Sequence, residues 1–362
     1  MLEKSVSKSE KVPWTRARRW LLCFLMLLLL MLTLTLSVYN SNPQLSWSLH
    51  LWSTRSWSTK SSNNMTIQPD SMSSVDPSKI GQYFVAYPHQ YHFILDEPDQ
   101  CQQQRPFLVL MIPVAPQNRA ARNAIRKTWA RETTVLGRVV SHYFLLGLAK
   151  EGDGAETLLE QGKVLQESRE HHDLLQSDFL DTYQNLTIKT MLILEWVTSR
   201  CPGVPYAMKI DSDMFLNVRN LVQMLQKAPQ HTYLTGMVAR GAPVVRDPSS
   251  KWFLPKEAFP DSHYPPYALG LGYVFTLDLA KKIIEASKHV KAVYIEDVYL
   301  GLCLRYMGIY PTDPPSGGLF KASMPYIWSN CYWTHVITTI LNSPQQLLDV
   351  WQTYQTKAQT GC

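Results

Sequence analysis

The stretch YAMKIDSDMFLN, from Tyr206 to Asn217, decides how the fold is interpreted. Its first five residues form a short apolar run that is typical of a buried strand. Asp211, Ser212 and Asp213 follow directly, and in isolation they indicate a solvated turn, because Asp and Ser form local hydrogen bonds in turns. The alternative is a pair of carboxylates at the edge of a sheet, placed to hold a metal ion.

Strands and helices alternate on both sides of this stretch. Apolar runs predict strands at residues 107–115, 141–147, 206–210 and 232–239, and helical patterns predict helices at residues 119–131, 186–200 and 221–226. This alternation predicts an α/β fold with a mostly parallel central sheet. Ligands of such sheets bind beyond the carboxyl ends of the strands, which favours a site at Asp211 and Asp213.

The N-terminal part of the chain predicts a membrane anchor. Residues 20–38, WLLCFLMLLLLMLTLTLSV, carry no charge and have the length of about 20 residues that a membrane-spanning helix needs. A cleaved signal peptide is the alternative, but its apolar core is usually about 7–15 residues and ends in small residues. Basic residues lie before the run, so we expect a cytosolic tail, a signal anchor, a stem and a lumenal catalytic domain. These parts would cover residues 1–19, 20–38, 39–100 and 101–362.

Composition and cysteines narrow the class of protein. The formal net charge of +6 is too small to indicate a partner such as nucleic acid. Cys23 lies in the apolar run, and the other five cysteines are too scattered for a zinc cluster and suit sparse disulfides in an oxidising compartment. Five is odd, so at least one is free or pairs with another chain, and the pairing stays open among Cys101, Cys201, Cys303, Cys331 and Cys362. Acceptor sequons for N-glycosylation begin at Asn64 and Asn185.

The stretch RNAIRKTW, residues 122–129, places Arg122, Arg126 and Trp129 on one face of a helix. Two guanidinium groups beside an indole suit a ligand that carries phosphates and a ring. The alternative is a solvated basic face with Ile125 and Trp129 packed in the core.

The stretch AVYIEDVYLGLCLRYMG, residues 292–308, predicts a β-type run that ends at Ile295 and a helix that starts near Glu296 and Asp297. Carboxylates in a first helical turn can serve only the helix dipole. The functional hypothesis is that one of the two is a general base at the edge of the sheet.

The stretch FPDSHYPPYALGLGYVFT, residues 259–276, turns from Pro-rich to Gly-rich. Gly270 and Gly272 allow a close approach of the backbone to a ligand, and Tyr264, Tyr267 and Tyr273 could offer flat faces to a sugar. The alternative is a loop followed by a core strand. A lone histidine such as His335 is more often packed or solvated than a metal ligand, and it gains weight only as a partner of Asp211 and Asp213.

Taken together, these stretches resemble the β-1,3-galactosyltransferases of the glycosyltransferase 31 family. The resemblance covers residues 100–345 in family order, through FLVLMIPVAP, RNAIRKTW, DLLQSDFLDTYQNLTIKT, MKIDSDMFLN, YPPYALGLGYVF, EDVYLGLCL and NCYWTHVIT. It implies a GT-A-type, Rossmann-like nucleotide-sugar-binding fold, a UDP-sugar donor and a manganese ion, with magnesium as the alternative metal. The chain departs from the family at Ala268-Leu269-Gly270, where many members have Cys-Ser-Gly, and at Trp129-Ala130, where they have Trp-Gly.

The same resemblance implies roles for individual residues. Asp211 and Asp213 match the metal and diphosphate site, His335 matches the histidine that completes the metal ligands, and Asp297 matches the catalytic base. Arg122, Arg126 and Trp129 belong to a signature helix that we assign to donor binding.

The implied reaction is a single displacement in which Asp297 takes the proton of the acceptor hydroxyl and the anomeric carbon is inverted. We expect galactose to move from UDP-galactose to the 3-hydroxyl of a terminal sugar, N-acetylglucosamine being the leading acceptor, on glycoprotein or glycolipid glycans. The alternatives are a β-1,3-N-acetylglucosaminyltransferase and a catalytically inactive glycan- or nucleotide-binding relative. The anchor and stem also resemble those of Golgi transferases, which implies a single-pass type II Golgi membrane protein, with a homodimer left open.

Overall fold

The computed structural model describes residues 26–27, 30–31, 33, 81–149, 154–325, 329 and 331–362. The chain divides into two compact units, Met1–Met72 and Ser73–Cys362, and the fold described below is that of the second unit. Most of the predicted anchor at residues 20–38, the stem up to residue 80 and the sequon at Asn64 lie outside the described residues. Within the described part of the chain, no helix is long and apolar enough to cross a membrane.

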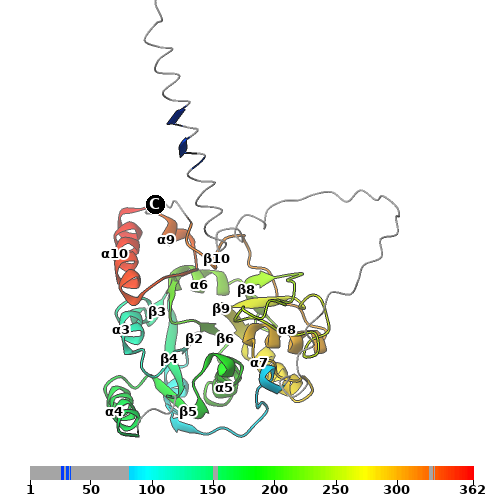
Figure 1. Cartoon of the computed structure of the whole chain (residues 1–362). Helices are drawn as coiled ribbons and strands as arrows, with labels where there is room; N and C mark the ends of the chain where they lie inside the picture. The colour runs from blue at the N-terminus through cyan, green and yellow to red at the C-terminus, as the bar shows by residue number, and fades with distance from the viewer. Residues whose placement is uncertain are drawn as a thin grey trace, which may run out of the picture. The chain divides into compact units, whose positions relative to one another are not determined.

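One large sheet forms the centre of this unit (Figure 1). Its strands run in the order β1, β5, β4, β2, β6, β9 and β8, and β3 pairs with β4. Their bounds are Phe93–Leu95 (β1), Leu108–Pro113 (β2), Thr134–Val135 (β3), Arg138–Leu148 (β4), Leu174–Leu180 (β5), Tyr206–Ile210 (β6), Leu234–Ala239 (β8) and Tyr267–Thr276 (β9). The central strands β5, β4, β2 and β6 are parallel, whereas β1, β3, β8 and β9 pair antiparallel with their neighbours. The predicted α/β fold is confirmed, with its parallel order in the middle of the sheet.

A second, small sheet lies beside the first and consists of β10 (Phe320–Lys321), β11 (Thr338–Ile340) and β7 (Met214–Leu216), in that order. The segment from Asp211 to Asp213 connects β6 of the large sheet to β7 of the small one. The two aspartates therefore lie at the junction between the sheets.

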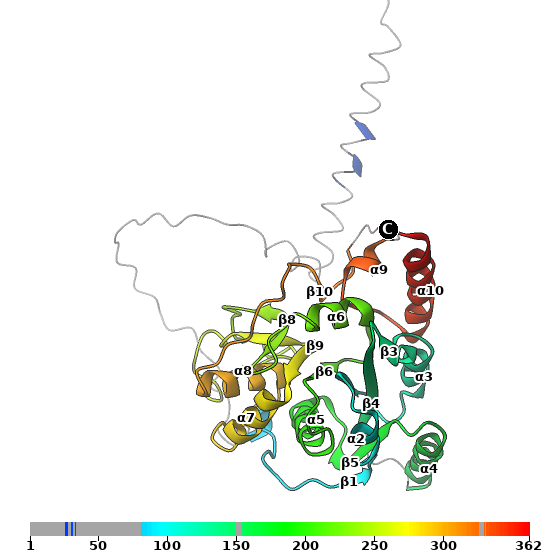
Figure 2. The ribbon, with the colours of Figure 1, turned by 180° about the vertical axis from the view of Figure 1, so that it is seen from behind.

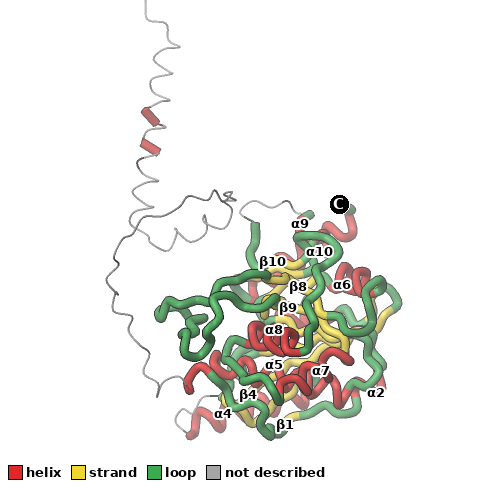
Figure 3. Tube along the Cα trace, turned by 90° about the vertical axis from the view of Figure 1, so that its right-hand side faces the viewer, coloured by secondary structure: helices red, strands yellow, loops and turns green. Residues whose placement is uncertain are grey.

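Helices cover both faces of the large sheet, as the opposite views in Figures 1 and 2 show. One face carries α5 (Leu186–Arg200), α7 (Leu277–Ser287) and α8 (Glu296–Tyr306), which lie side by side in Figure 3. The other face carries α3 (Arg119–Lys127), α4 (Gly154–His171), α6 (Val218–Leu225) and α10 (Pro344–Thr360). The short helices are α2 (Gln100–Gln104), α9 (Tyr332–His335), η4 (Trp129–Arg131) and η5 (Tyr183–Asn185).

Strand β2 shows why the sequences of the central strands are continuous apolar runs. Its side chains alternate between two hydrophobic cores, with Val109 and Met111 packed on the α5 side. Leu108, Leu110 and Ile112 pack on the α3 side. A strand that is covered on both faces has no solvent-facing position, so apolar residues fill every place.

The predicted helix 186–200 and strand 206–210 are confirmed at their bounds. The predicted helix 119–131 ends earlier, because Thr128 leaves the helical conformation and Trp129–Arg131 form a separate 3-10 turn. The prediction of a β run that ends at Ile295 is wrong, because Val293 forms only an isolated bridge to Phe84 and no strand.

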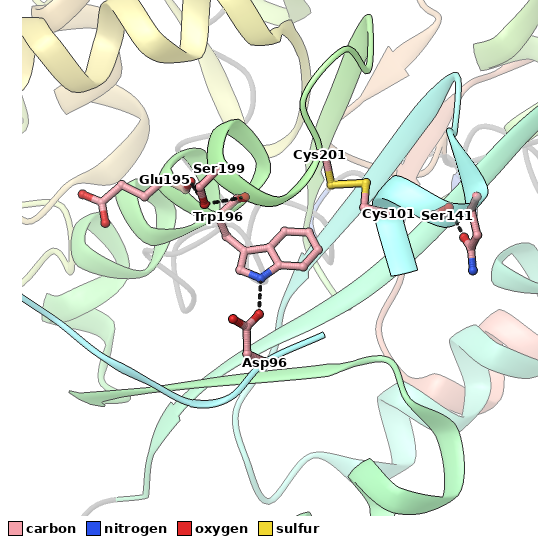
Figure 4. The surroundings of a disulfide bond; sticks show 8 residues. Asp96, Cys101, Ser141, Glu195, Trp196, Ser199 and Cys201 are labelled. Atoms are coloured by element: carbon pink, nitrogen blue, oxygen red, sulfur yellow. Dashed lines mark hydrogen bonds between the residues drawn. A yellow bond between two sulfur atoms is a disulfide. The ribbon is translucent and has the colours of Figure 1, made fainter. Parts of the chain in front are cut away.

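Two disulfides close parts of the described fold. Cys101 in α2 bonds to Cys201 at the end of α5, next to Trp196, whose indole nitrogen donates to Asp96 at 2.7 Å (Figure 4). The second disulfide joins Cys331 to Cys362. Among the described cysteines, Cys303 is buried and forms no disulfide within the chain. This agrees with the expectation that at least one of the five is free or pairs with another chain.

Candidate active site

Four carboxylates gather where β6 ends and α8 begins. Asp211 and Asp213 follow the last residue of β6, and Glu296 and Asp297 are the first two residues of α8. The backbone N–H of Asp211 donates to the carbonyl of Leu271 at 3.1 Å, which holds the aspartate segment against β9. The predicted position of these groups at the carboxyl edge of the parallel strands is therefore confirmed.

Lys209, the second-last residue of β6, connects the two pairs of carboxylates. Its buried ammonium group donates to Asp211 Oδ1 at 2.7 Å, to Glu296 Oε1 at 2.9 Å and to the carbonyl oxygen of Gly270. An ammonium group has three donors, so all of them are used here. Burial alone would lower the pKa of Lys209, but the charges of Asp211 and Glu296 raise it above its ordinary value. Lys209 therefore stays a fixed cation at the centre of the site.

Glu296 is held entirely from within the protein. Its Oε2 accepts hydrogen bonds from Thr190 Oγ1 at 3.1 Å and from the Tyr273 hydroxyl at 3.2 Å. Burial raises the pKa of Glu296 to about 7, the Lys209 charge opposes that rise and the Asp297 charge adds to it. Because Glu296 is buried and its carboxylate faces partners inside the protein, it is poorly placed to act on a bound molecule.

Asp297 keeps part of its surface exposed. Its Oδ2 accepts from the backbone N–H of Gly270 at 2.9 Å, and its Oδ1 accepts from the N–H of Val298 at 2.8 Å. Removal of water raises the pKa of Asp297, and the two backbone donors oppose that rise. A carboxylate with a raised pKa is a stronger proton acceptor than an ordinary aspartate. Of the two carboxylates at the start of α8, Asp297 is thus the better candidate for the general base.

Gly270 lies between β9 and the start of α8, where no larger residue fits. A Cβ atom at this position would come within 2.5 Å of Glu296 Oε1. The close backbone approach expected of this Gly-rich segment is present, but the described neighbour is the protein's own carboxylate.

The tyrosines of the same segment are mostly buried. Tyr264 and Tyr273 have almost no exposed surface, and Tyr273 binds Glu296, so the hypothesis that they offer open faces to a sugar is wrong for these two. Tyr267 is partly exposed, and burial together with the Asp297 charge raises its pKa to about 12.

Asp211 and Asp213 form the carboxylate pair that could hold a cation. Loss of water around the carboxylate, and then the charge of Asp211, raise the pKa of Asp213 above its usual range. A cation near both groups would relieve this repulsion. Mg²⁺ and similar hard ions commonly take one or two protein carboxylates and complete their shell with phosphate oxygens and water. The pair therefore fits a divalent ion that arrives together with a nucleoside diphosphate.

The structure does not bring His335 to this pair. Strands β7 and β11 are antiparallel, and their ends are fixed by hydrogen bonds from Leu341 N to Asp213 O and from Asn217 N to Ile337 O. His335 precedes Ile337, so it lies beyond the opposite end of β7 from Asp213. Its Nδ1 is 2.8 Å from the Cys331 carbonyl oxygen, and its side chain lines a separate cavity of about 570 Å³. Among the described residues, no group of three or more His, Cys, Asp or Glu side chains is placed to hold a metal, so the predicted three-residue set is not assembled.

Arg122 and Arg126 have partners inside the fold. The buried Arg122 binds both oxygens of Glu167 at 2.7 Å and the carbonyls of Ala115 and Pro116. Arg126 binds Glu167 at 2.7 Å and both oxygens of Asp173 at 2.7 and 2.8 Å. These contacts favour neither a solvated basic face nor an open phosphate site, and the donor-binding role of both arginines stays a prediction.

Trp129 is fully buried, and its indole nitrogen donates to the carbonyl oxygen of Met214 at 3.1 Å. Met214 follows Asp213 directly, so this hydrogen bond fixes the backbone next to the aspartate segment. This packing agrees with the alternative interpretation of Trp129 as a core residue, and its donor contact stays a prediction.

Sequence reasoning missed the network around Lys209. The signal was present, because a lysine in the apolar run YAMKI must either leave the core or find an acceptor there. Thr190 and Tyr273 carried no signal of their own, since both occur in patterns typical of packed helices and strands.

The fold and this site define an α/β enzyme whose carboxylates lie at the end of a parallel strand. Residues 120–315 match a family model described as galactosyltransferase. The chain is 38% identical over 312 residues to beta-1,3-galactosyltransferase 2 of Homo sapiens, covering 83% of this chain and 73% of that protein. It is 40% identical over 278 residues to beta-1,3-galactosyltransferase 1 of Mus musculus, covering 76% of this chain and 82% of that protein. The chain therefore belongs to the galactosyltransferase family and is a hexosyltransferase.

One solved structure, the galactosyltransferase LgtC in complex with donor and acceptor sugar analogues, is 10% identical to the chain. It overlaps with a TM-score of 0.34 over 68% of this chain and 95% of that one, a likeness too low to bear on the fold.

Proposed function

We propose that this protein transfers galactose from UDP-galactose to the 3-hydroxyl of a terminal N-acetylglucosamine, with inversion to a β-1,3 linkage. Two features support the proposal: similar proteins are named β-1,3-galactosyltransferases, and the carboxylates of Asp211, Asp213 and Asp297 lie where β6 ends and α8 begins. The observation that carries it is the orientation of Asp297 by two backbone donors beside the Lys209 network. A GT-A-type donor site on this sheet is part of the proposal.

In this mechanism Asp297 accepts the proton of the acceptor hydroxyl as that oxygen attacks the anomeric carbon. The attack comes from the face opposite the diphosphate, so a single displacement turns an α-linked donor into a β-linked product. A Mn²⁺ or Mg²⁺ ion held by Asp211 and Asp213 would stabilise the negative charge of the UDP leaving group. Lys209 keeps Asp211 and Glu296 in fixed positions, and the Gly270 N–H holds Asp297 through its Oδ2.

The test is a transfer assay with UDP-galactose and UDP-N-acetylglucosamine on acceptors that end in N-acetylglucosamine or galactose. We expect galactose transfer with Mn²⁺, loss of transfer with a chelator and recovery when Mn²⁺ is restored. Asp297→Asn should abolish transfer, whereas Asp349→Asn, a matched change at an exposed position of α10, should not. A well-folded protein that transfers no sugar from any UDP-sugar would overturn the proposal.

Two alternatives give different results in the same assay. Transfer of N-acetylglucosamine alone would make the chain a β-1,3-N-acetylglucosaminyltransferase with the same mechanism. UDP or glycan binding that is unchanged by Asp297→Asn, with no transfer to lose, would indicate an inactive binding relative. The departure at Ala268 gives that alternative little support, because Ala268 is buried in β9 opposite Val238 and removes no acid or base from the site.

We also propose that the enzyme is a single-pass type II protein of the Golgi membrane that acts on glycoprotein or glycolipid glycans in the lumen. The uncharged run at residues 20–38 and the basic residues before it support this proposal. Protease protection of the C-terminal part in sealed Golgi vesicles would test the orientation. Association into a homodimer, the remaining proposal, is tested by light scattering of the purified chain.

A further inference from the structure

Two exposed aromatic side chains belong to segments that contact Tyr294, three residues before the candidate base, and neither has a part in the mechanism above. Trp252 is 50% exposed and Tyr183 is 37% exposed. The Lys251 ammonium group lies 4.7 Å from the ring centroid of Trp252 and 5.4 Å from that of Tyr183. The cation therefore contacts both rings and links them, an arrangement that cation–π attraction stabilises. We call Tyr183, Lys251 and Trp252 the aromatic clamp.

Hydrogen bonds fix the clamp beside the start of α8. Lys251 and Trp252 belong to the loop that connects β8 to β9. The hydroxyl of Tyr294 lies 2.9 Å from the Lys251 carbonyl oxygen and 2.8 Å from that of Phe253, so it anchors the loop on both sides of Trp252. Tyr294 precedes Asp297 by three residues, so the loop is tied to the segment that leads into α8.

Tyr183 reaches the same place from another part of the chain. It belongs to η5, directly before α5, and its ring centroid is 6.4 Å from that of Tyr294. Thr187 in the first turn of α5 donates to the Val293 carbonyl oxygen at 2.8 Å and holds this end of the helix against the start of α8. Burial, and then the Asp297 charge, raise the pKa of Tyr183, which agrees with its position near the base.

The loop that carries Trp252 is tied down rather than free. Arg246 donates to the carbonyls of Phe259 and Asp261 at 2.8 and 2.7 Å and also to that of Leu254, which is fully buried. Trp252 is thus held at the surface by a loop that Arg246 and the buried Leu254 keep in place. A large aromatic side chain that is fixed and yet exposed is typical of a ligand contact, because ordering it in advance lowers the entropy cost of binding.

We infer that Tyr183 and Trp252 form the acceptor subsite, where their rings stack on the sugar whose hydroxyl faces Asp297. This inference rests on the proposed function for the role of Asp297. Sugars present apolar C–H faces between their hydroxyl groups, and aromatic side chains commonly line sites for such ligands. The clamp is assigned to the acceptor because it is anchored at Tyr294, next to the base, which must lie beside the acceptor hydroxyl.

The experiment measures the KM of both substrates for the full chain and its variants. Trp252→Ala should raise the acceptor KM about tenfold and leave the UDP-galactose KM within about twofold. Trp252→Phe should keep most of the affinity, because it retains an aromatic face. Tyr306→Ala is the matched control, since Tyr306 is 57% exposed but ends α8, about 13 Å along the helix from Asp297. It should change neither KM.

A second measurement separates the subsite from the reaction. Saturation-transfer NMR would detect binding of a β-N-acetylglucosaminide to the wild type and to Trp252→Ala. If the wild type transfers no sugar but binds the glycoside in a Trp252-dependent way, the proposed function fails and the subsite stands. If the wild type transfers galactose and Trp252→Ala behaves like Tyr306→Ala, or raises only the donor KM, the subsite is overturned and the function stands. A wild type that neither transfers nor binds overturns both.

Discussion

Two clusters of buried charge in this enzyme use the same residue types with opposite results. Beside α3, three arginines meet three carboxylates, namely Arg119, Arg122 and Arg126 with Glu167, Glu170 and Asp173. At the end of β6, by contrast, one buried cation, Lys209, and the exposed Lys251 act on four carboxylates, those of Asp211, Asp213, Glu296 and Asp297. The first cluster is balanced, and the second has an excess of negative charge.

The pKa values of the carboxyl groups follow this difference. Burial alone would raise the pKa of Asp173, but the hydrogen bonds from Arg126 and His142 hold it down at about 2. Burial raises the pKa of Glu296 to about 7, because Lys209 is shared with Asp211 and Asp297 adds a like charge. A balanced cluster is complete without a ligand, whereas excess negative charge is relieved when a proton or a metal ion binds. The comparison teaches that the balance of charge, more than its burial, separates the structural cluster beside α3 from the cluster at the end of β6 that we propose is catalytic, called the catalytic cluster below.

The largest effect should come from Asp297→Asn in the catalytic cluster. Loss of a general base typically lowers the rate by about 10²- to 10⁴-fold, and we expect the upper part of that range because Glu296 is buried and held by Lys209, Thr190 and Tyr273. The free energy of unfolding should fall by about 1–3 kcal/mol, because the amide oxygen can accept from only one of the two backbone donors and the NH2 group faces the other. Single-turnover rates and urea unfolding measure the two quantities. A variant that retained more than a tenth of the wild-type rate would show that the base lies elsewhere.

Arg122→Met in the balanced cluster should have the opposite effect, with a large loss of stability and no loss of catalytic rate. Removing one partner of a buried ion pair leaves Glu167 without its strongest contact, which typically costs about 3–5 kcal/mol of unfolding free energy. The kcat per folded molecule should stay the same, because Arg122 does not reach the catalytic cluster.

Urea unfolding and active-site titration check this prediction. Arg305→Met is its control, because Arg305 forms an exposed pair with Asp261 outside this cluster and should cost no more than about 1 kcal/mol. A large fall in kcat or a rise in the UDP-galactose KM for Arg122→Met would instead restore the donor-binding role.

Lys209→Met tests how far the catalytic cluster depends on its buried cation. We expect a loss of about 3 kcal/mol in unfolding free energy, because two carboxylates lose their common partner. The pH dependence should change as well. Asp297 must be deprotonated to act, so activity is lost as the pH falls through its raised pKa, and the Lys209 charge holds that pKa down. Without Lys209 the acid limb of the log(kcat/KM) profile should therefore move to higher pH.

Lys189→Met is the matched control for that profile. Lys189 is equally buried, but it pairs with Asp181 at 2.7 Å and with the Val114 carbonyl oxygen. Its loss should lower stability and leave the acid limb in place. If both variants moved the limb equally, the effect would reflect general destabilisation rather than the charge of Lys209.

The smallest effect should come from Gly270→Ala, which changes the distances within the catalytic cluster and leaves its charge unchanged. The added Cβ would press on Glu296 Oε1, and forced packing of this kind typically costs about 1–3 kcal/mol. Because the same residue binds Asp297 and Lys209, kcat should fall with stability. Gly317→Ala meets no atom within 4 Å and should stay within about 0.5 kcal/mol of the wild type. Thermal unfolding and the transfer assay compare the two.

Local sequence pattern was enough to predict the elements that carry the catalytic cluster. Strand β6 and helix α5 are apolar runs with clear ends. The order of strands and helices was enough to predict that the carboxylates after β6 and at the start of α8 lie at the edge of the sheet. Pattern failed where the partner is distant in sequence. The spacing of Arg122 and Arg126 indicates a shared helix face, but only the fold shows that Glu167 and Asp173 cover it. The position of His335 likewise depends on the pairing of β7 with β11, which no local signal contains.

Asp297 owes its orientation to main-chain amides of Gly270 and Val298 rather than to neighbouring side chains. Among the twenty residue types only proline lacks that N–H, so substitutions at Val298 other than proline leave its donor in place, whereas Gly270 has no room for a side chain. An alanine scan would therefore reveal the contribution of Gly270 and miss the N–H of Val298. The same feature would allow side chains around the site to be exchanged during evolution, because main-chain donors keep Asp297, the proposed base, in its orientation. A change of glycan specificity would then not require the catalytic machinery to be rebuilt.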